Sequence, residues 1–496
     1  MPSVCVYVNS GTVIPDNTEV LRIHTANLSE IEIPDSVTEI IINTVDACDI
    51  SELALPPRLE IFSFFYDMCK GSLDSINFPP TLSHLCIRRE IMQRLSNINF
   101  PMSLEKLEIE VYREDDLHYS AFPVGLKELV LSAKYKLHID EYSLPKKLSK
   151  LTINPLISPN NPDVFPDSLE ELCIVVGSCG EYNMPKYPRF LTVLRLGVCC
   201  EYTIRPGELP DTIKILTHGN YNQILSKDII PKYLEELDLG SRYNQPLMCD
   251  VFPETLRVLK IYSRYLPVLG KNSLPKCIES FSLGIYYGGN LHSDIFPSDL
   301  QDLHLGDRYT GELTENTLPP NLVSLNLGRD FDEDISSGMF PGTLAKLNMG
   351  LTYTRKIGQN NLPANLIELR LSESYNHDID YIFLPDTIEF LSLGNKFGSK
   401  IVVECLPLNL KYLSVCTREH LEYLCEIANS INFSIIYDAN LIATVSFTYP
   451  ILINVKFAYD SSYQNIETEI ISGNEYNKLV NPVSFEPRSM CKSAKK

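Results

Sequence analysis

Residues 305–350 read LGDRYTGELTENTLPPNLVSLNLGRDFDEDISSGMFPGTLAKLNMG, and this stretch contains two copies of one pattern. The segment LPPNLVSLNLG (318–328) is followed 22 residues later by FPGTLAKLNMG (340–350). Each copy has an apolar residue, a proline, three further apolar positions and a glycine. A fixed period of this kind is typical of repeat architectures, so it decides how the rest of the chain is interpreted.

The proline that follows an apolar residue marks the repeat along most of the 496-residue chain. Seventeen steps between the first and last of these prolines cover 373 residues, so the mean period is close to 22. Pro15 indicates a nineteenth, shortened copy. The full set is Pro34, Pro56, Pro79, Pro101, Pro123, Pro145, Pro166, Pro188, Pro210, Pro231, Pro253, Pro275, Pro297, Pro319, Pro341, Pro363, Pro385 and Pro407.

After each proline comes LxxLxL or a close relative, as at Leu300, Leu303 and Leu305. The last two apolar positions are two residues apart, which is the spacing of one face of a β-strand. The residues between them vary in chemistry. The pattern therefore predicts about nineteen short strands, each with one apolar face toward a core and one free, mostly polar face.

Three further positions recur after the strand. A glycine such as Gly306 follows it, and we expect the glycine to supply a positive φ at a tight bend. An aromatic residue such as Tyr309 stands three residues later, and an apolar residue such as Leu313 four residues after that. Because these aromatics recur at one phase of the repeat, we predict that they are buried and stacked. The proline is expected on an extended back of the coil, where its fixed φ and missing N–H are tolerated.

One 22-residue unit cannot bury its apolar side chains alone, but stacked units can. The repeat therefore predicts a β-rich, right-handed solenoid with one parallel sheet and one strand per coil. Residues 1–13 are predicted to form an N-terminal capping strand, residues 14–416 the repeats, and residues 417–496 a C-terminal cap and extension. Within the last segment, TREHLEYLCEIANSI (417–431) predicts a short capping helix with Thr417 as N-cap, and residues 432–458 are expected to form strands.

The repeat resembles the leucine-rich repeat, whose period is roughly 20–29 residues. It is more closely similar to the FNIP repeat, a family of social amoebae and of large DNA viruses that infect amoebae. That unit has an aromatic-Asn pair followed by LPxxLxxLxLG, and here Tyr243-Asn244 and Tyr375-Asn376 stand at the aromatic-Asn positions. The resemblance covers roughly residues 14–416 and implies a scaffold that binds other proteins.

Composition narrows the function classes. The formal net charge is −20, which disfavours nucleic-acid binding. Neither a run of about 18 apolar residues nor a secretory signal is found, so we expect an intracellular, cytoplasmic protein (in the host cytoplasm if it is viral) that does not enter membranes. The 14 cysteines include no CxxC, and we expect them to be reduced. The sequence gives no evidence for an oligomer.

The chain has no recognisable catalytic or cofactor-binding motif, and we expect no enzyme, cofactor or metal. The acidic stretch DFDED (330–334) alternates aspartates as a calcium loop does, but Ile335 stands where such a loop needs glycine, so a solvated turn is the interpretation. His304 has no identifiable nucleophile or acid partner, and we interpret it as a strand residue. A polysaccharide-active β-helix enzyme is the alternative, although its coils should contain two or three strands.

The predicted function is a non-enzymatic scaffold that binds a protein of unknown identity on the variable strand face. A narrower alternative is a substrate receptor for a host ubiquitin ligase, acting through a separate adaptor. Since the apolar positions are fixed by the core, only the intervening positions are free to encode a partner. The candidate binding residues are Glu236, Asp238, Lys260, His304, Asn326, Asn348 and Arg370.

Overall fold

A computed structural model describes most of the chain up to residue 424 and four strands beyond it. The described residues are 5–8, 12–24, 27–43, 49–50, 53–65, 73–91, 95–111, 118–133, 137–139, 141–153, 157–159, 164–175, 186–197, 203–264, 269–271, 273–287, 291–315, 317–379, 384–417, 419–420, 423–424, 434–437, 443–448, 452–457 and 467–471. They fall into two compact units, Met1–Ile261 and Tyr262–Lys496, which are described in turn. The main sheet has 21 strands in total.

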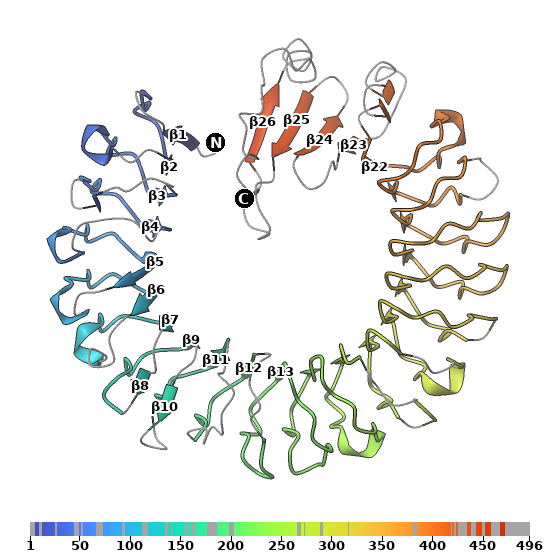
Figure 1. Cartoon of the computed structure of the whole chain (residues 1–496), viewed down its shortest axis with the longest axis horizontal. Helices are drawn as coiled ribbons and strands as arrows, with labels where there is room; N and C mark the ends of the chain where they lie inside the picture. The colour runs from blue at the N-terminus through green and yellow to red at the C-terminus, as the bar shows by residue number, and fades with distance from the viewer. Residues whose placement is uncertain are drawn as a thin grey trace, which may run out of the picture. The chain divides into compact units, whose positions relative to one another are not determined.

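In its described residues the first unit has fifteen strands, and thirteen of them belong to the main sheet. Figure 1 labels β1 to β13 among them. Every described strand pair of this sheet in the unit is parallel, and each strand pairs with that of the next coil. The strands are β1 (Cys5–Val8), β2 (Val20–Ile23), β3 (Glu39–Ile42), β4 (Ile61–Phe64), β5 (His84–Ile91), β6 (Lys106–Val111), β7 (Glu128–Ala133), β8 (Leu137–Ile139), β9 (Lys150–Ile153), β10 (Ile157–Pro159), β11 (Glu171–Ile174), β12 (Val193–Leu196), β13 (Ile215–His218), β14 (Glu236–Asp238) and β15 (Val258–Lys260).

The second unit is built from the same kind of coil. Its strands β16 (Ser280–Ser282), β17 (Asp302–His304), β18 (Ser324–Asn326), β19 (Lys346–Asn348), β20 (Glu368–Arg370), β21 (Phe390–Ser392), β22 (Tyr412–Val415) and β23 (Ser434–Tyr437) pair in parallel, each with the next. A separate antiparallel sheet follows, made of β24 (Ala443–Thr448), β25 (Leu452–Phe457) and β26 (Glu467–Ile471). The predicted solenoid of 22-residue coils with a parallel sheet is confirmed.

Helix is scarce in the described residues. Several coils contain one 3₁₀ turn away from the strand: Leu28–Glu30, Leu73–Ser75, Leu95–Asn97, Tyr119–Ala121, Cys249–Val251, Ser293–Ile295 and Val403–Cys405. Of the predicted C-terminal helix, residues 419–420 and 423–424 are helical, and the backbone N–H of His420 donates to Thr417 Oγ1 at 3.3 Å, the bond expected of an N-cap. Much of its remainder, and the C-terminal residues 472–496, lie outside the described residues.

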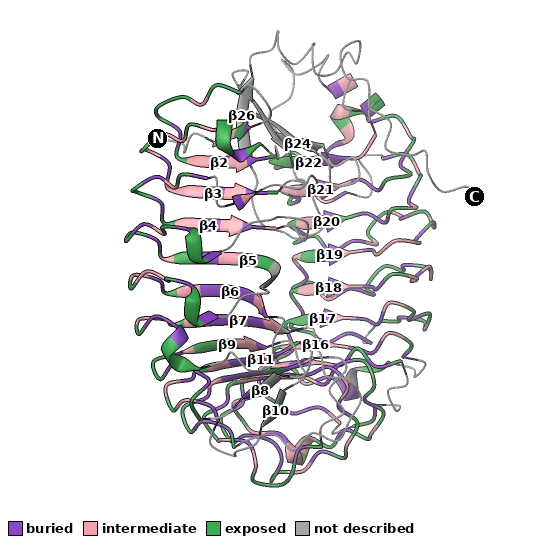
Figure 2. Cartoon of the chain, turned by 60° about the vertical axis from the view of Figure 1, so that its left-hand side comes forward, coloured by how far each residue is buried: buried purple, intermediate pink, exposed green. Residues whose placement is uncertain are grey.

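The core is built as the repeat predicts. In the coil of β18, Leu322, Leu325 and Leu327 are each at most 1% exposed. Figure 2 shows the consequence for β2, β3 and β4, whose residues alternate between half-buried and buried. The phase-locked aromatics are buried as predicted at Tyr243, Tyr287, Tyr309, Phe331, Tyr353, Tyr375 and Phe397. Tyr135 and Tyr265 lie outside the described residues.

The aromatic side chains of successive coils stack on one another. The ring centroids of Phe331 and Tyr353 are 6.4 Å apart at an interplanar angle of 8°, and those of Tyr353 and Tyr375 are 6.4 Å apart at 11°. Offset ring pairs at such separations are favourable beyond the area they bury. One aromatic per coil thus forms a second column of contacts behind the sheet.

The proline has a different role from the one expected. Rather than lying on an extended back, it begins the turn that leads into the strand, because its carbonyl accepts the N–H of the leucine three residues later. Leu344 N donates to Pro341 O at 3.0 Å, for example. The ring therefore fixes φ at the start of a tight turn, where a missing N–H also costs nothing.

A hydroxyl two residues after the proline links neighbouring coils, which the sequence reasoning missed. Thr343 Oγ1 donates to Leu322 O at 2.8 Å, across one repeat. The signal was present in the sequence as a recurring Ser or Thr at that position. The same bond is made by Thr81, Ser103, Ser168, Thr212, Thr255 and Thr387.

Two coils also depart from one strand per coil. Strands β8 and β10 pair in parallel as a separate two-stranded sheet, in register from Leu137 with Ile157 to Ile139 with Pro159. The extra pairing is limited to these neighbouring coils among those described. It therefore does not extend into the multi-sheet coil expected of a β-helix.

Candidate functional site: the outward strand face

The seven candidate residues all lie on the outward side of strands, in two groups. In the first unit, Glu236 and Asp238 lie on β14, and Lys260 is paired in register with Asp238 on β15. In the second unit, His304, Asn326, Asn348 and Arg370 occupy one position on four successive strands. Parallel register thus places side chains that are 22 residues apart in sequence side by side.

Three of these side chains also hold the end of their own strand. Asn326 Oδ1 accepts the backbone N–H of Gly328 at 2.9 Å, and Asn348 Oδ1 accepts that of Gly350 at 3.0 Å. Asp238 Oδ1 accepts from Gly240 at 2.8 Å in the same way. Short Asx side chains commonly bond to the backbone two residues on. The amide or carboxylate at these positions therefore supports the bend that ends the strand.

The glycine at this bend is required for close approach as well as for φ. Gly350 has φ +75°, but a Cβ placed on it would also lie 1.8 Å from the carbonyl oxygen of Gly328. Gly306 has no left-handed φ, yet its Cβ would lie 1.8 Å from Gly284 O. The expectation that φ alone explains the glycines was thus incomplete, because backbone contact between adjacent coils excludes a side chain.

Charges on the strand face are paired, either between coils or within one strand. Lys260 Nζ lies 2.7 Å from Glu236 Oε1, with both side chains about a third exposed. Arg370 Nε lies 2.8 Å from Glu368 Oε1, and its guanidinium stands 5.0 Å from the centroid of the Phe390 ring. These pairs fix the side-chain positions more than they stabilise the fold, since exposed ion pairs contribute only about 0–1 kcal/mol.

Further ion pairs form ladders that the sequence reasoning missed. Lys106 Nζ and Glu128 Oε1 are 2.6 Å apart, and Lys150 Nζ and Glu171 Oε1 are 2.8 Å apart, along one outward column of β6, β7, β9 and β11. The signal was available as charges that alternate in sign at the repeat period. Equivalent pairs are Glu105 with Lys127 and Lys214 with Glu235.

Two titratable side chains of the face have shifted pKa values. Burial raises the pKa of the Asp238 carboxyl, opposed by the Gly240 N–H and by Lys260. Burial lowers the pKa of the His304 imidazole, opposed by the carboxylates of Asp307 and Asp302. His304 Nε2 is 4.0 Å from Asp307 Oδ1, beyond hydrogen-bond reach. The described contacts of His304 include none to a nucleophile that it could activate.

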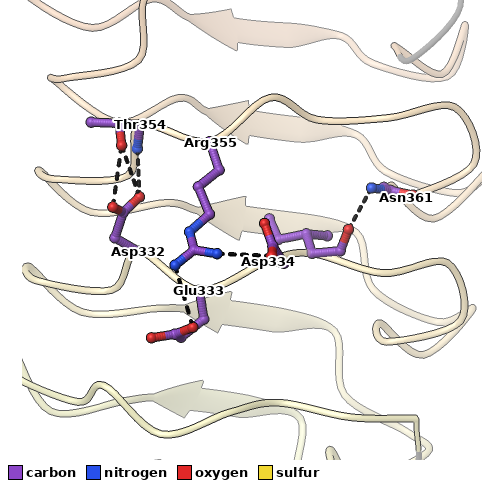
Figure 3. A network of polar contacts seen from close by, with 7 residues as sticks. Asp332, Glu333, Asp334, Thr354, Arg355 and Asn361 are labelled. Carbon is purple, nitrogen blue, oxygen red and sulfur yellow. Dashed lines mark hydrogen bonds and ion pairs between the residues drawn. The ribbon is translucent and has the colours of Figure 1, made fainter.

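The acidic stretch 330–334 is held by hydrogen bonds and arginine contacts (Figure 3). Asp332 accepts from the backbone N–H of Thr354 at 2.8 Å, and Asp334 lies 2.8 Å from Arg355, which also approaches Glu333 at 3.5 Å. Asn361 donates to the carbonyl of Ile335 nearby. In the part of the chain that the structure describes, no group of three His, Cys, Asp or Glu side chains is placed to hold a metal ion.

Asp332 stands at the second position of the aromatic-Asn pair, and it shows what that position does. Asn222 Oδ1 accepts the backbone N–H of Asn244 at 3.0 Å, and Asn376 Oδ1 accepts that of Gly398 at 2.8 Å, each across one coil. Asp332 accepts from Thr354 in the same geometry. An aspartate can therefore replace the asparagine, because only the acceptor oxygen is used.

Comparisons with known proteins agree with this geometry. The FNIP Repeat family model matches residues 221–263, 289–328, 309–352 and 353–396, the coils that have the glycine bend and stacked aromatics. The chain carries FNIP repeats. Outside these four matched segments the same proline and leucine spacing continues, and some of those coils also have the glycine, as at Gly197 and Gly284.

One solved structure is similar enough to show the same fold. CroV588, a giant-virus protein described as a novel circular leucine-rich-repeat protein, is 21% identical with a TM-score of 0.52, over 86% of this chain and 73% of that one. An internalin (inlF) from Listeria monocytogenes is 12% identical with a TM-score of 0.30, over 67% of this chain and 81% of that one. No protein of curated function matches the sequence. Among the described residues, no helix has the length and apolar character needed to cross a bilayer.

Proposed function

We propose that this FNIP-repeat protein is a non-enzymatic scaffold that binds a protein partner on its outward strand face. The observation that carries the proposal is the contrast within each strand. Leu303, Leu325, Leu347 and Leu369 repeat one core side chain, whereas the adjacent outward position holds His304, Asn326, Asn348 and Arg370 in register. A regular backbone whose outward side chain varies among the coils suits recognition of an extended protein surface.

The charged candidates support a polar, selective contact. Glu236 and Lys260 hold each other in fixed positions, and Arg370 is held by Glu368 and Phe390. Fixed charges favour partners of complementary pattern and penalise others more than they increase affinity. The candidates that brace a glycine bend, Asn326 and Asn348, would act mainly by shaping the backbone that the partner meets.

A charge swap tests the proposal without breaking the fold. The double variant Glu236→Lys/Lys260→Glu can keep the ion pair while reversing its direction, and Glu368→Arg/Arg370→Glu does the same on β20. We expect the free energy of unfolding of the quadruple variant to lie within about 1 kcal/mol of that of the wild type. We also expect this variant to lose its principal partner in quantitative affinity purification from amoebal lysate. Lys214→Glu/Glu235→Lys, a swap one column away, is the matched control.

The result that would overturn the proposal is a quadruple variant that captures every partner of the wild type with the same yield. The alternatives would then be an enzymatic role or a binding site on the turns opposite the strands. Conversely, a variant that loses partners while the control swap keeps them assigns recognition to this face.

A further inference from the structure

The outward residue just before each strand forms a continuous column, because its N–H donates to the carbonyl of the same position in the preceding coil. In the first unit this column is polar throughout: Glu19, Thr38, Glu60, Ser83, Glu105, Lys127, Ser149, Glu170, Thr192, Lys214, Glu235 and Arg257. In the second unit it reads Glu279, Gln301, Val323, Ala345, Ile367, Glu389 and Lys411. Three consecutive coils thus replace polar residues with apolar ones.

These three residues lie on the surface and extend into a larger apolar area. Val323 is 37% exposed and Ile367 45% exposed. The N–H of Phe390 donates to Ile367 O at 3.1 Å, so the half-buried Phe390 ring follows Ile367 on the next coil. Tyr412, 46% exposed, is paired in register with Phe390. We call Val323, Ala345, Ile367, Phe390 and Tyr412 the β18–β22 patch. Packing of the core does not require an apolar side chain at any of these outward positions.

A single unpaired cation stands beside the patch. Lys346 is exposed on β19 between Ser324 and Glu368 in register, and no carboxylate of the described chain forms an ion pair with it. The neighbouring charges are satisfied, since Arg370 pairs with Glu368 and Lys411 with Glu389. This contrasts with the ladders of the first unit, where Lys106 and Lys150 each have a glutamate partner.

We propose that the β18–β22 patch is the docking site for an extended segment of another protein that has apolar side chains and a carboxylate positioned for Lys346. This inference rests on the proposed function and specifies its site and partner chemistry. A second copy of this chain fits less well, because each copy has a net charge of −20 and the copies would repel one another. Exposed aromatic and aliphatic side chains beside one unpaired charge are typical anchors of peptide recognition.

The test is a selection of random peptides, displayed on phage, against the full-length protein. We expect enriched peptides to combine aliphatic or aromatic residues with Asp or Glu. Their affinity should fall about tenfold or more in Ile367→Ser and in Tyr412→Ser. The matched control is Leu408→Ser, since Leu408 is 85% exposed in the same unit but lies in the turn after a proline.

Reversing the charge of Lys346 gives the most specific part of the test. Selection against Lys346→Glu should enrich peptides with Lys or Arg in place of the acidic residue, whereas selection against Lys400→Glu, an exposed lysine off the strand face, should not. Unfolding curves of each variant check that the fold persists.

Three outcomes would overturn the docking site: peptides whose affinity is unchanged in Ile367→Ser and Tyr412→Ser, a preference that does not invert in Lys346→Glu, or self-association of the wild type that Ile367→Ser abolishes. If enriched peptides depend on the Glu236–Lys260 swap instead, this inference fails while the proposed function stands. If enriched peptides depend on neither set, both fail.

Discussion

The coils around β6 and the coils around β18 share one period but end their strands differently. Strands β6 and β7 are six residues long, and their pairing continues through Glu110 with Ser132 and Val111 with Ala133. Strands β18 and β19 are three residues long, and the chain turns away at Gly328 and Gly350. The proline and leucine spacing therefore fixes the coil, whereas the turn at the glycine ends β18 and β19 early.

The two kinds of coil also differ in what lies on their surfaces. Around β6 to β11 the outward columns are filled by lysine and glutamate that pair between coils. Around β18 to β22 the corresponding columns hold apolar residues and Lys346, which forms no ion pair with the described part of the chain. A surface whose charges are already paired offers less to a partner than one whose apolar side chains remain in water. Binding capacity is thus expected to be uneven along the repeat.

The stacked aromatics should account for the largest single contribution to the glycine-bend coils. Tyr309 is 1% exposed and stacks on Tyr287 at 6.5 Å, so Tyr309→Ala should cost about 3–5 kcal/mol in free energy of unfolding, measured by urea denaturation. Tyr286, its exposed neighbour in the preceding coil, is the control, and Tyr286→Ala should cost less than about 1 kcal/mol. Equal losses for the two variants would show that the column of rings is not part of the core.

A side chain at the bend should be the next most damaging change. Gly350→Ala places a Cβ 1.8 Å from Gly328 O at a φ of +75°, and we expect a loss of about 2–3 kcal/mol in the same denaturation measurement. Ser132→Ala, at the equivalent position on β7, should change stability by less than about 0.5 kcal/mol. A Gly350→Ala protein as stable as the wild type would mean that the coils separate easily, which contradicts the close approach.

Removing the hydroxyl should change stability in opposite directions at two tyrosines of the stacked column. Tyr287→Phe leaves the buried N–H of Leu269 without its 3.1 Å acceptor and should cost about 1–2 kcal/mol. The hydroxyl of Tyr353 is buried and bonds to no group in the described chain, so Tyr353→Phe should stabilise by about 0.5–1 kcal/mol. Thermal melts of both variants, run together, check the prediction, and a shift of the same sign in both would refute it.

The smallest expected effect concerns Asp238. Because burial raises the pKa of the Asp238 carboxyl, the folded state still binds a proton at pH values where the unfolded state has released it. The free energy of unfolding therefore falls as pH rises from the unfolded-state pKa through the folded-state pKa. Asp238→Asn keeps an acceptor for Gly240 N–H and should gain about 0.5 kcal/mol at pH 7. The gain should shrink as urea denaturation is repeated toward pH 4. A variant that is less stable at pH 7 would show that attraction to Lys260 outweighs burial.

The sequence by itself determined the coil. Its proline spacing gave the 22-residue period, its LxxLxL gave one strand per coil with a buried face, and the phase of Tyr309 and its equivalents predicted burial. These inferences succeeded because a core position must be apolar in every coil, so the signal is repeated many times. The seven candidate residues could likewise be assigned to the outward face from the strand period alone.

Tertiary structure decided what each outward side chain does. Only the parallel register shows that Glu236 meets Lys260 and that Asn326 and Asn348 brace a glycine instead of facing a partner freely. It also places Lys346 where no carboxylate of the described residues forms an ion pair with it. It also shows that Gly306 is excluded from carrying a side chain by the carbonyl of the neighbouring coil. These contacts join residues of neighbouring coils that are far apart in the sequence, and a linear pattern does not contain the distances between them.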